Sequence, residues 1–434
     1  MGSNPVQLVA LGAAAMIAVL GLVLLIRRHP RWGIALWTVA LFFTPVWLGA
    51  GAMGVFVSAL TAMTVIAIIS GISPNLRWSN VDTLVLILFL VILLAFAIGG
   101  SITGHVQDAV VMWFLPYVWG RMVLARVDEG WVAACLATAA VAAAVLGIVE
   151  FVTSENFFLR IPGASSSIWG VLQVRGGFLR VEGAFGHSIA LGGVLAMSAA
   201  FVLVVRWRPW VRAVALVVVG AATVLTFSRL GIIGFALTLV LGVVFLGVYV
   251  GRGLRITVLG FLVAGAIAVT PVILDVFGDA GSEAEGSANY RLDLLGLTNS
   301  MVVLGISPDR EVLPTGEDYW AGFRSIDSAL ILIGLRFGML PLAVVLVLLA
   351  VLIGSVVIGR ATPASVALAA QIPAFATVAL ITQYAAFVWF AAGLAVSAYA
   401  LRYGRDAADL AAAAALTETP PRVGERRLST GAGR

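Results

Sequence analysis

Apolar residues follow one another in long runs along this chain, and short polar connections separate the runs. A transmembrane helix needs roughly 20 mostly apolar residues, so each run of about 17–25 residues is a candidate span. The candidates cover residues 7–26, 33–49, 53–72, 83–101, 108–124, 131–152, 188–205, 211–227, 230–250, 255–274, 327–354, 363–382 and 385–402. They predict an all-α fold, a polytopic transmembrane helix bundle of about 12 or 13 spans.

The composition agrees with this pattern and excludes other classes of protein. Hydrophobic residues make up 62% of the 434 residues, and charged residues make up only 11%, against roughly 25% in an average soluble domain. A soluble domain has too little interior to bury so much apolar surface. The composition therefore excludes a soluble globular protein, a disordered chain and a nucleic-acid-binding domain.

Arginine supplies all 26 basic residues, and most of them lie in alternate connections between the runs. The positive-inside rule assigns such connections to the cytoplasm. They contain Arg27, Arg28, Arg31, Arg77, Arg121, Arg126, Arg206, Arg208, Arg212, Arg252, Arg255, Arg360, Arg402 and Arg405. We predict a multi-pass protein of the cytoplasmic (inner) membrane, with a transmembrane domain over residues 1–402. Residues 403–434 have no apolar face and predict a disordered cytoplasmic tail.

Two long segments on the opposite side, about 153–187 and 275–326, interrupt the series of short connections. The second is expected to be a large external loop with short helices. Eight arginines lie in these segments or at the helix ends beside them: Arg160, Arg175, Arg180, Arg229, Arg291, Arg310, Arg324 and Arg336. Basic residues on the translocated side oppose the expected orientation, so they require another explanation. For Arg310 and Arg324, pairing with local acids remains the alternative.

The first candidate site precedes the run at 188–205. Arg175, Arg180, Glu182 and His187 lie within 13 residues, among glycines that permit tight turns. Guanidinium groups match phosphate oxygens, and Glu182 or His187 could act as a base. The alternative is a helix start whose polar groups face the lipid headgroups.

The second candidate is the pair Ser228 and Arg229, which apolar runs flank on both sides. An arginine at this depth is costly unless its side chain reaches the interface or meets an anion. Ser228 and the first free amides of the next helix could donate hydrogen bonds to the same anion. Snorkelling of Arg229 to the interface is the alternative.

Three further candidates lie in or after the large loop. Arg291 belongs to a stretch that predicts a short amphipathic helix on the membrane surface, ending near Gly305. Asp327 is at or near the N-cap of an apolar helix, either as a cap or as a carboxylate at the site of substrate entry. Arg336 is expected about two and a half turns deeper, where an acid of the bundle could pair with it.

Metal and cofactor chemistry has little support in the sequence. Cys135 is the only cysteine, so neither an internal disulfide nor a cysteine-based metal cluster is possible. The three histidines are His29, His105 and His187, which argues against a multi-histidine site. The chain has no phosphate-loop motif and no convincing internal repeat. We expect no metal and no cofactor.

The order of these motifs resembles the family of O-antigen ligases and polysaccharide polymerases, which are polytopic membrane glycosyltransferases. The resemblance extends from about Asp82 to Leu342. The residues that carry it are Pro116-Tyr117 with Gly120-Arg121, Glu182 with Gly186-His187, Phe227-Ser228-Arg229-Leu230-Gly231, Arg291, Leu304-Gly305, and Asp327-Ser328 with Gly338. The position of Asp327 is a histidine in the ligases, so the aspartate favours a polymerase or a ligase-like relative with another acceptor.

This resemblance implies a donor glycan linked to undecaprenyl diphosphate, used on the external face of the membrane. Arg229 and Arg291 would engage the diphosphate, with Arg180 and Arg175 as further candidates. Arginine contacts can neutralise such a leaving group without a divalent metal. An acceptor hydroxyl on a glycan, lipid or protein would then attack the anomeric carbon with inversion. Asp327 or Glu182 would assist as the base.

Two other hypotheses remain open. The same arginines could bind phosphate in a transporter or flippase for a lipid-linked or anionic solute, with Glu150 as the main embedded acid for ion coupling. A non-catalytic membrane scaffold is the third, but it leaves the cost of Arg229 unexplained. All three involve membrane lipids as partners and none involves nucleic acid.

Overall fold

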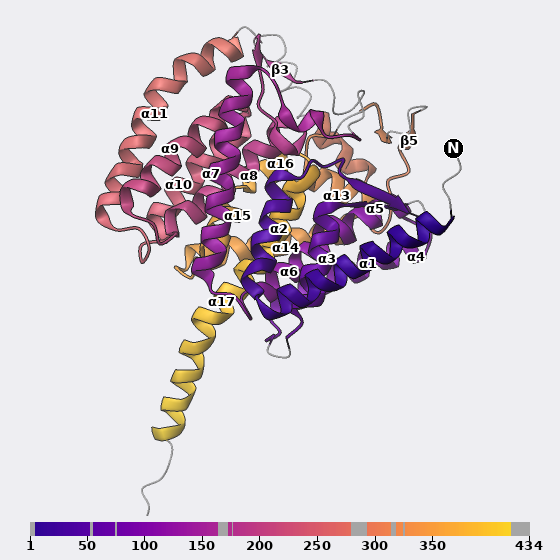
Figure 1. Ribbon diagram of the computed structural model, residues 1–434, viewed down its shortest axis with the longest axis horizontal. Coiled ribbons are helices and arrows are strands. Elements are labelled where there is room, and N and C mark those ends of the chain that lie inside the picture. The colour runs from indigo at the N-terminus through magenta and orange to yellow at the C-terminus, as the bar shows by residue number, and fades with distance from the viewer. Residues whose placement is uncertain are drawn as a thin grey trace, which may run out of the picture.

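A computed structural model describes residues 5–52, 55–73, 76–163, 172–175, 177–278, 293–313, 318–323 and 326–417. Figure 1 shows helices packed side by side, with short strands confined mainly to one end. The helices are α1 (Pro5–Arg28), α2 (Pro30–Phe43), α3 (Ala59–Gly71), α4 (Asn80–Ala97), α5 (Thr103–Asp108), α6 (Leu115–Val123), α7 (Glu129–Thr153), α8 (Ser188–Val204), α9 (Pro209–Leu225), α10 (Arg229–Phe245), α11 (Arg252–Gly278), α13 (Ala329–Phe337), α14 (Met339–Val357), α15 (Pro363–Ala369), α16 (Ile372–Thr377) and α17 (Thr382–Thr417). The prediction of a mainly helical protein is confirmed.

Apolar helices long enough to cross a bilayer occur at four places in the described part of the chain. They are α4, α7, α14 and the part of α17 from Thr382 to Tyr403. The helices α3, α8, α9 and α10 are also apolar but shorter. These helices indicate a membrane protein, because a run of this length and composition is stable in hydrocarbon.

Short elements connect the helices. A π-helix, η1 (Ala109–Phe114), joins α5 to α6, and 3-10 turns form η2 (Phe157–Arg160), η3 (Gly183–Phe185) and η4 (Leu297–Ser300). The strands pair as three antiparallel ribbons: β1 (Gly49–Ala52) with β2 (Val55–Ser58), β3 (Val174–Arg175) with β4 (Phe178–Leu179), and β5 (Arg310–Val312) with β6 (Asp318–Trp320). The first ribbon interrupts the sequence between the predicted spans 33–49 and 53–72, where Pro45 cannot continue a helix.

The centre of the bundle is α8, which is buried along almost its whole length. It packs against α7, α9, α10, α15 and α17. Glycines allow the closest of these contacts, because a Cβ atom on Gly231 would lie 3.0 Å from Gly192 Cα on α8. Backbone contact at this distance is typical of small residues at helix interfaces in membranes. It fixes the start of α10 against α8.

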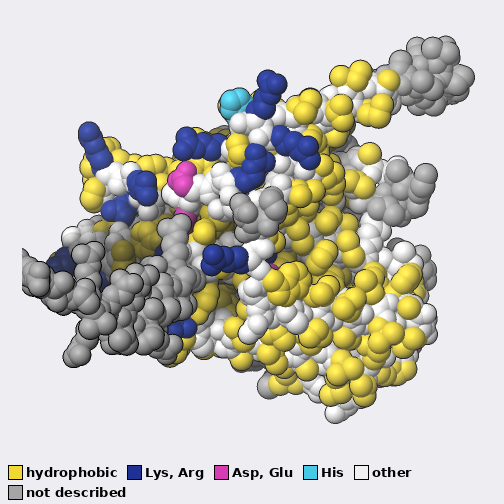
Figure 2. Space-filling view, turned by 90° about the horizontal axis from the view of Figure 1, so that it is seen from below, with side chains coloured by type: hydrophobic (Ala, Val, Ile, Leu, Met, Phe, Trp, Pro, Cys, Tyr) yellow, Lys and Arg dark blue, Asp and Glu magenta, His cyan; other side chains and the backbone are white. Residues whose placement is uncertain are grey.

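The two ends of the bundle differ in charge. We call one the basic end, which includes the helix ends near Arg27, Arg77, Arg126, Arg208 and Arg360; all five side chains are exposed. Figure 2 shows arginine side chains gathered on this face. Hydrogen bonds hold some of its connections together; for example, Arg126 donates to the carbonyls of Ser70 and Arg27 at 2.7 and 2.6 Å.

The opposite end, which we call the loop end, comprises the described parts of 154–187 and 293–323. Its lower-numbered part includes β3 and β4, and its higher-numbered part packs on α13 through a small apolar cluster of its own. That cluster contains Leu294, Leu297, Trp320, Ile326, Ile331 and Leu335.

The structure differs from the local expectations at three places. Helix α17 continues beyond residue 403 to Thr417, since the alanine-rich sequence there has high helix propensity, and residues 418–434 of the expected disordered tail lie outside the described residues. The helical stretch after residue 293 ends with η4 at Ser300, before Gly305. The predicted span 327–354 is two helices, α13 and α14, which Gly338 separates at a φ of +99°.

Candidate functional site

The loop end brings two sequence-predicted arginines onto one short turn. The turn Thr226–Ser228 joins α9 to α10. Arg180 Nε donates to the Thr226 carbonyl at 3.0 Å, and Arg175 Nη1 donates to the Phe227 carbonyl at 3.2 Å. A backbone hydrogen bond from Val181 to Leu225 holds the two segments together. Arg175 and Arg180 therefore lie beside Ser228 and Arg229, although about 50 residues separate them in the chain.

The turn itself is strained. Phe227 has a φ of +45°, which side-chain-bearing residues rarely adopt. Ser228 then caps α10, because its Oγ accepts the Gly231 amide at 3.2 Å. Arg229 is the first residue of α10 and is half-buried. Strain of this kind persists only where the surroundings enforce it, and it is often found at functional sites.

The guanidinium of Arg180 has unused hydrogen-bonding capacity. Its Nη1 donates to Gln173 Oε1 at 3.1 Å, and its Nη2 is buried with no partner among the described residues. Burial, and then the nearby Arg175 guanidinium, lowers the pKa of Arg180 to about 10. Positive charge is thus concentrated in a partly dehydrated place, and an anion bound there would relieve the repulsion.

Glu182 lies under this cluster and is 2% exposed. Its Oε1 accepts the amide of Gln173 at 3.2 Å. Burial raises the pKa of Glu182, while the Gln173 amide and Arg180 oppose this effect. In the described arrangement Glu182 therefore supports the segment that carries Arg175 and Arg180.

His187 begins α8, and its imidazole caps the helix. The Nδ1 atom accepts the Ile189 amide at 3.2 Å, so the ring is neutral in this arrangement. Burial, and then Arg180, lowers the pKa of His187 to about 4. In this arrangement the Nδ1 atom of His187 serves as the N-cap acceptor of α8.

Glu150, near the end of α7, anchors the whole segment. It accepts hydrogen bonds from the amides of Glu182 and Gly183 at 3.0 and 2.9 Å, and from Asn156 Nδ2 at 3.3 Å. Sequence reasoning did not assign Glu150 to this site. The available signal was an acid near the end of an apolar run.

Replacing Glu150 by leucine is expected to lower the free energy of unfolding by about 3 kcal/mol or more. Three buried donors would lose their acceptor, and each buried unsatisfied group costs about 1–3 kcal/mol. Glu150→Gln keeps one carbonyl acceptor, so a loss of about 1 kcal/mol is expected. Thermal unfolding in detergent measures both. Glu155→Gln, at an exposed acid of the same segment, is the control; equal stability of E150L and this control would contradict the assignment.

Asp327 precedes α13, and Ser328 caps that helix by accepting the Ile331 amide at 3.3 Å. Asp327 itself is exposed. The Ala329 amide donates to the Val378 carbonyl at 2.9 Å, and Val378 lines a narrow crevice together with Leu230. The starts of α10 and α13 are therefore neighbours across α16. This brings the segment of Asp327 to the same region as Arg229.

The remaining predicted residues lie elsewhere. Arg291 lies outside the described residues. Arg336 lies near the end of α13, to which the segment 302–307 hydrogen-bonds, for example from the Ser307 amide to the Leu335 carbonyl at 2.8 Å. Its electrostatic neighbours include Asp108 and Asp318.

Asp318 is the centre of a second polar cluster at the loop end. It accepts from Arg310 Nε at 2.8 Å and from His105 Nε2, also at 2.8 Å. Burial tends to raise the pKa of Asp318, but these hydrogen bonds outweigh it and lower the pKa below the usual value. Arg310 therefore pairs with a local acid, Asp318, as the alternative for this arginine proposed. Sequence reasoning missed His105 and Asp318, which 213 residues separate.

The described residues offer no group of three or more histidine, cysteine, aspartate or glutamate side chains that could hold a metal ion. The donors of the first cluster are guanidinium, hydroxyl and amide groups, which bind anions. Comparisons with protein-family models, curated proteins and solved structures find no match for this chain.

Proposed function

We propose that the chain is a membrane glycosyltransferase that ligates or polymerises glycans linked to undecaprenyl diphosphate. The alternating arginine-rich connections support a multi-pass topology in the cytoplasmic membrane, with the basic end inside. The loop end, with the cluster of Arg175, Arg180 and Arg229 and the polar cluster around Asp318, then faces the periplasm or the cell exterior.

The observation that carries this proposal is the meeting of Arg175, Arg180 and Arg229 at the Thr226–Ser228 turn. Arg175 and Arg180 donate hydrogen bonds to carbonyls of the turn. The Nη2 of Arg180 is buried without a partner in the described structure. Guanidinium groups bind phosphate oxygens with paired, charge-assisted hydrogen bonds. The motif resemblance adds Arg291 and makes a diphosphate the matching anion.

The chemistry follows from neutralising the leaving group. As the bond between the anomeric carbon and the diphosphate oxygen breaks, negative charge accumulates on the diphosphate. Arginines fixed at this place stabilise that charge, and no metal is required. The proton of the attacking acceptor hydroxyl passes to a carboxylate. Asp327 suits this role better than Glu182, because the Asp327 side chain is exposed and the Glu182 side chain is buried.

Replacing Arg229 by alanine is expected to reduce glycan transfer about 100-fold or more. Removing one group that stabilises developing charge in a transition state costs about 10²–10³ in rate. The assay uses purified protein in liposomes, with an undecaprenyl-diphosphate-linked glycan as donor and gel or mass analysis of the product. Arg160→Ala, at an exposed arginine of the loop end, is the control and should transfer normally.

Full transfer by the Arg229→Ala variant would exclude the proposal. If the wild-type protein moved a labelled lipid across liposomes without transferring sugar, the transporter or flippase hypothesis would be favoured instead. Glu150, the acid considered for ion coupling in that hypothesis, accepts three hydrogen bonds within the fold. This occupancy speaks against a coupling role for Glu150.

A further inference from the structure

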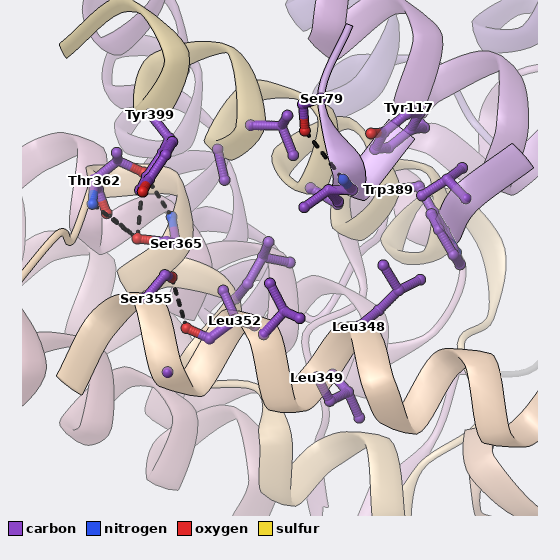
Figure 3. Close-up of a pocket in the computed structure, with 18 of the residues that line it drawn as sticks. Ser79, Tyr117, Leu348, Leu349, Leu352, Ser355, Thr362, Ser365, Trp389 and Tyr399 are labelled. Carbon is purple, nitrogen blue, oxygen red and sulfur yellow. Dashed lines mark hydrogen bonds between the residues drawn. The ribbon is translucent and has the colours of Figure 1, made fainter. Parts of the chain in front are cut away.

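A large cavity lies between α4, α6, α13, α14, α15 and α17, and on α13 its lining begins at Ala329, two residues after Asp327. Its volume is about 950 Å³, near the upper limit of ordinary ligand pockets. Figure 3 shows its wall, where Leu348, Leu349 and Leu352 of α14 face Trp389 of α17. We call it the lateral groove. The proposed glycan transfer gives it no role.

The lateral groove is elongated along the helices. Its lining extends from Val345 on α14 to Ile358, the C-cap of that helix, and from Val388 to Tyr403 on α17. At 1.5 Å per residue, each stretch is roughly 20 Å long. The hydrocarbon of one leaflet is about 15 Å thick. The groove therefore has the length and the surface that acyl chains of a single leaflet require.

One mouth of the groove lies at the basic end and is polar. Arg77 precedes α4, and Arg360 follows α14; both side chains are exposed. Arg360 Nη1 donates to the Tyr399 hydroxyl at 2.8 Å, which directs its guanidinium toward α17. The described lining contains these two arginines and no acidic side chain. This mouth therefore attracts an anion.

The wall on one side is also accessible from the bilayer. Helix α14 is the least buried of the four long apolar helices, with 17% of its apolar window buried. A lipid can therefore enter from the side, between α14 and its neighbours. The lipid does not need to pass through the interior of the bundle to reach the groove.

We propose that the lateral groove binds an anionic phospholipid of the leaflet at the basic end. The phosphate lies between Arg77 and Arg360, and the acyl chains lie along α14 and α17. The charge of the mouth selects this occupant, because anionic lipids are attracted to basic residues near the cytoplasmic surface. A bound phosphate would link the segment before α4 to the end of α14. This proposal does not depend on the glycosyltransferase activity.

The test measures lipid binding to the purified full-length chain in neutral detergent by native mass spectrometry. Phosphatidylglycerol is compared with phosphatidylcholine that carries the same acyl chains. We expect tighter binding of phosphatidylglycerol and a higher unfolding temperature in its presence. Removing both arginines, R77A with R360A, should weaken phosphatidylglycerol binding about 25-fold. This corresponds to about 1 kcal/mol, or fivefold, for each arginine.

A second variant tests the apolar part of the groove. Gly354 lines it on α14, and a Cβ atom there would meet nothing within 4 Å. Gly354→Phe should therefore fill the groove without disturbing the fold, and should weaken binding of both lipids at least tenfold. Gly260→Phe on α11 is the matched control, because its Cβ position is also open and it lies outside the groove.

Three results would overturn the proposal. The first is equal affinity for phosphatidylglycerol and phosphatidylcholine. The second is wild-type binding by G354F. The third is displacement of phosphatidylglycerol by undecaprenyl phosphate, which would assign the groove to the polyprenyl chain of a donor. Full transfer by the Arg229→Ala variant would exclude the proposed function and would leave all three measurements unaffected, so the two proposals fail separately.

Discussion

Replacing Arg121 by alanine is expected to lower the free energy of unfolding by about 3–5 kcal/mol, the range found when one partner of a buried ion pair is removed. Arg121 is 4% exposed and holds Asp82 with two hydrogen bonds of 2.6 and 2.8 Å. The Tyr117 hydroxyl also donates to Asp82, and Arg121 Nη1 donates to Ser397 Oγ at 2.8 Å. The variant would leave the Asp82 carboxylate buried without its cation. Thermal or denaturant unfolding in detergent measures the loss.

A double variant separates this explanation from a loss of packing. Asp82→Leu combined with Arg121→Met replaces the ion pair by apolar groups, so it should recover much of the stability that Arg121→Ala loses. Arg208→Ala, at an exposed arginine of the basic end, should change the free energy of unfolding by less than about 0.5 kcal/mol. Equal losses in Arg121→Ala and Arg208→Ala would show that the pair does not stabilise the bundle.

Replacing Gly393 by alanine is expected to have a comparably large effect. A Cβ atom at Gly393 would lie 2.1 Å from the Tyr117 carbonyl oxygen of α6. The same distance separates a Cβ at Gly120 from the Phe390 carbonyl oxygen of α17. Backbone atoms cannot move aside as a side chain can, so α6 and α17 must separate. Overpacking of this kind costs about 1–3 kcal/mol and sometimes more, and we expect the upper part of that range.

The control for this prediction is Gly260→Ala on α11. No atom lies within 4 Å of a Cβ at Gly260, so the substitution gains helix propensity without a clash. Its unfolding temperature should equal or exceed that of the wild type. If G393A were as stable as G260A, the close approach of α6 and α17 would not be needed for stability.

The helical character of the protein followed from the apolar runs alone, because a helix in hydrocarbon satisfies its own backbone. The interruptions were harder to predict. The run 327–354 has one apolar character throughout, yet it bends at Gly338, where the Val303 carbonyl and Leu304 backbone lie within 3 Å of a Cβ position. That bend depends on the segment 302–307 of the loop end, which packs there from elsewhere in the chain. Periodicity within one run carries no information about such a partner.

In the candidate site, too, the sequence indicated some residues and gave no sign of their partners. Arg175, Arg180 and Arg229 could be selected from the sequence because their charge conflicts with the expected orientation. Ser228 was selected as a hydroxyl beside Arg229. Their partners could not be selected, since Arg180 is held by a backbone carbonyl and by Gln173. Backbone acceptors are the same at every position, so no residue type marks them. The strained Phe227 is likewise an ordinary apolar residue in the sequence.

Arg121 shows a different case, because the charge rule assigned it to a cytoplasmic connection and the sequence did not indicate its structural role. In the structure it is a buried partner of Asp82, which lies 39 residues earlier. The charge rule predicts on which side of the bilayer a basic residue lies. It does not predict whether the side chain is solvated or buried.

The contact between α6 and α17 also constrains the order of events during synthesis. Arg121 and Ser397 are 276 residues apart. At ribosomal speeds of about 5–20 residues per second, α6 precedes its partner by roughly 14–55 s. Throughout that interval α17 does not yet pack on Gly120 of α6. The wall of the lateral groove that α17 supplies is also absent. The nascent bundle is therefore open to lipid before it is closed by protein.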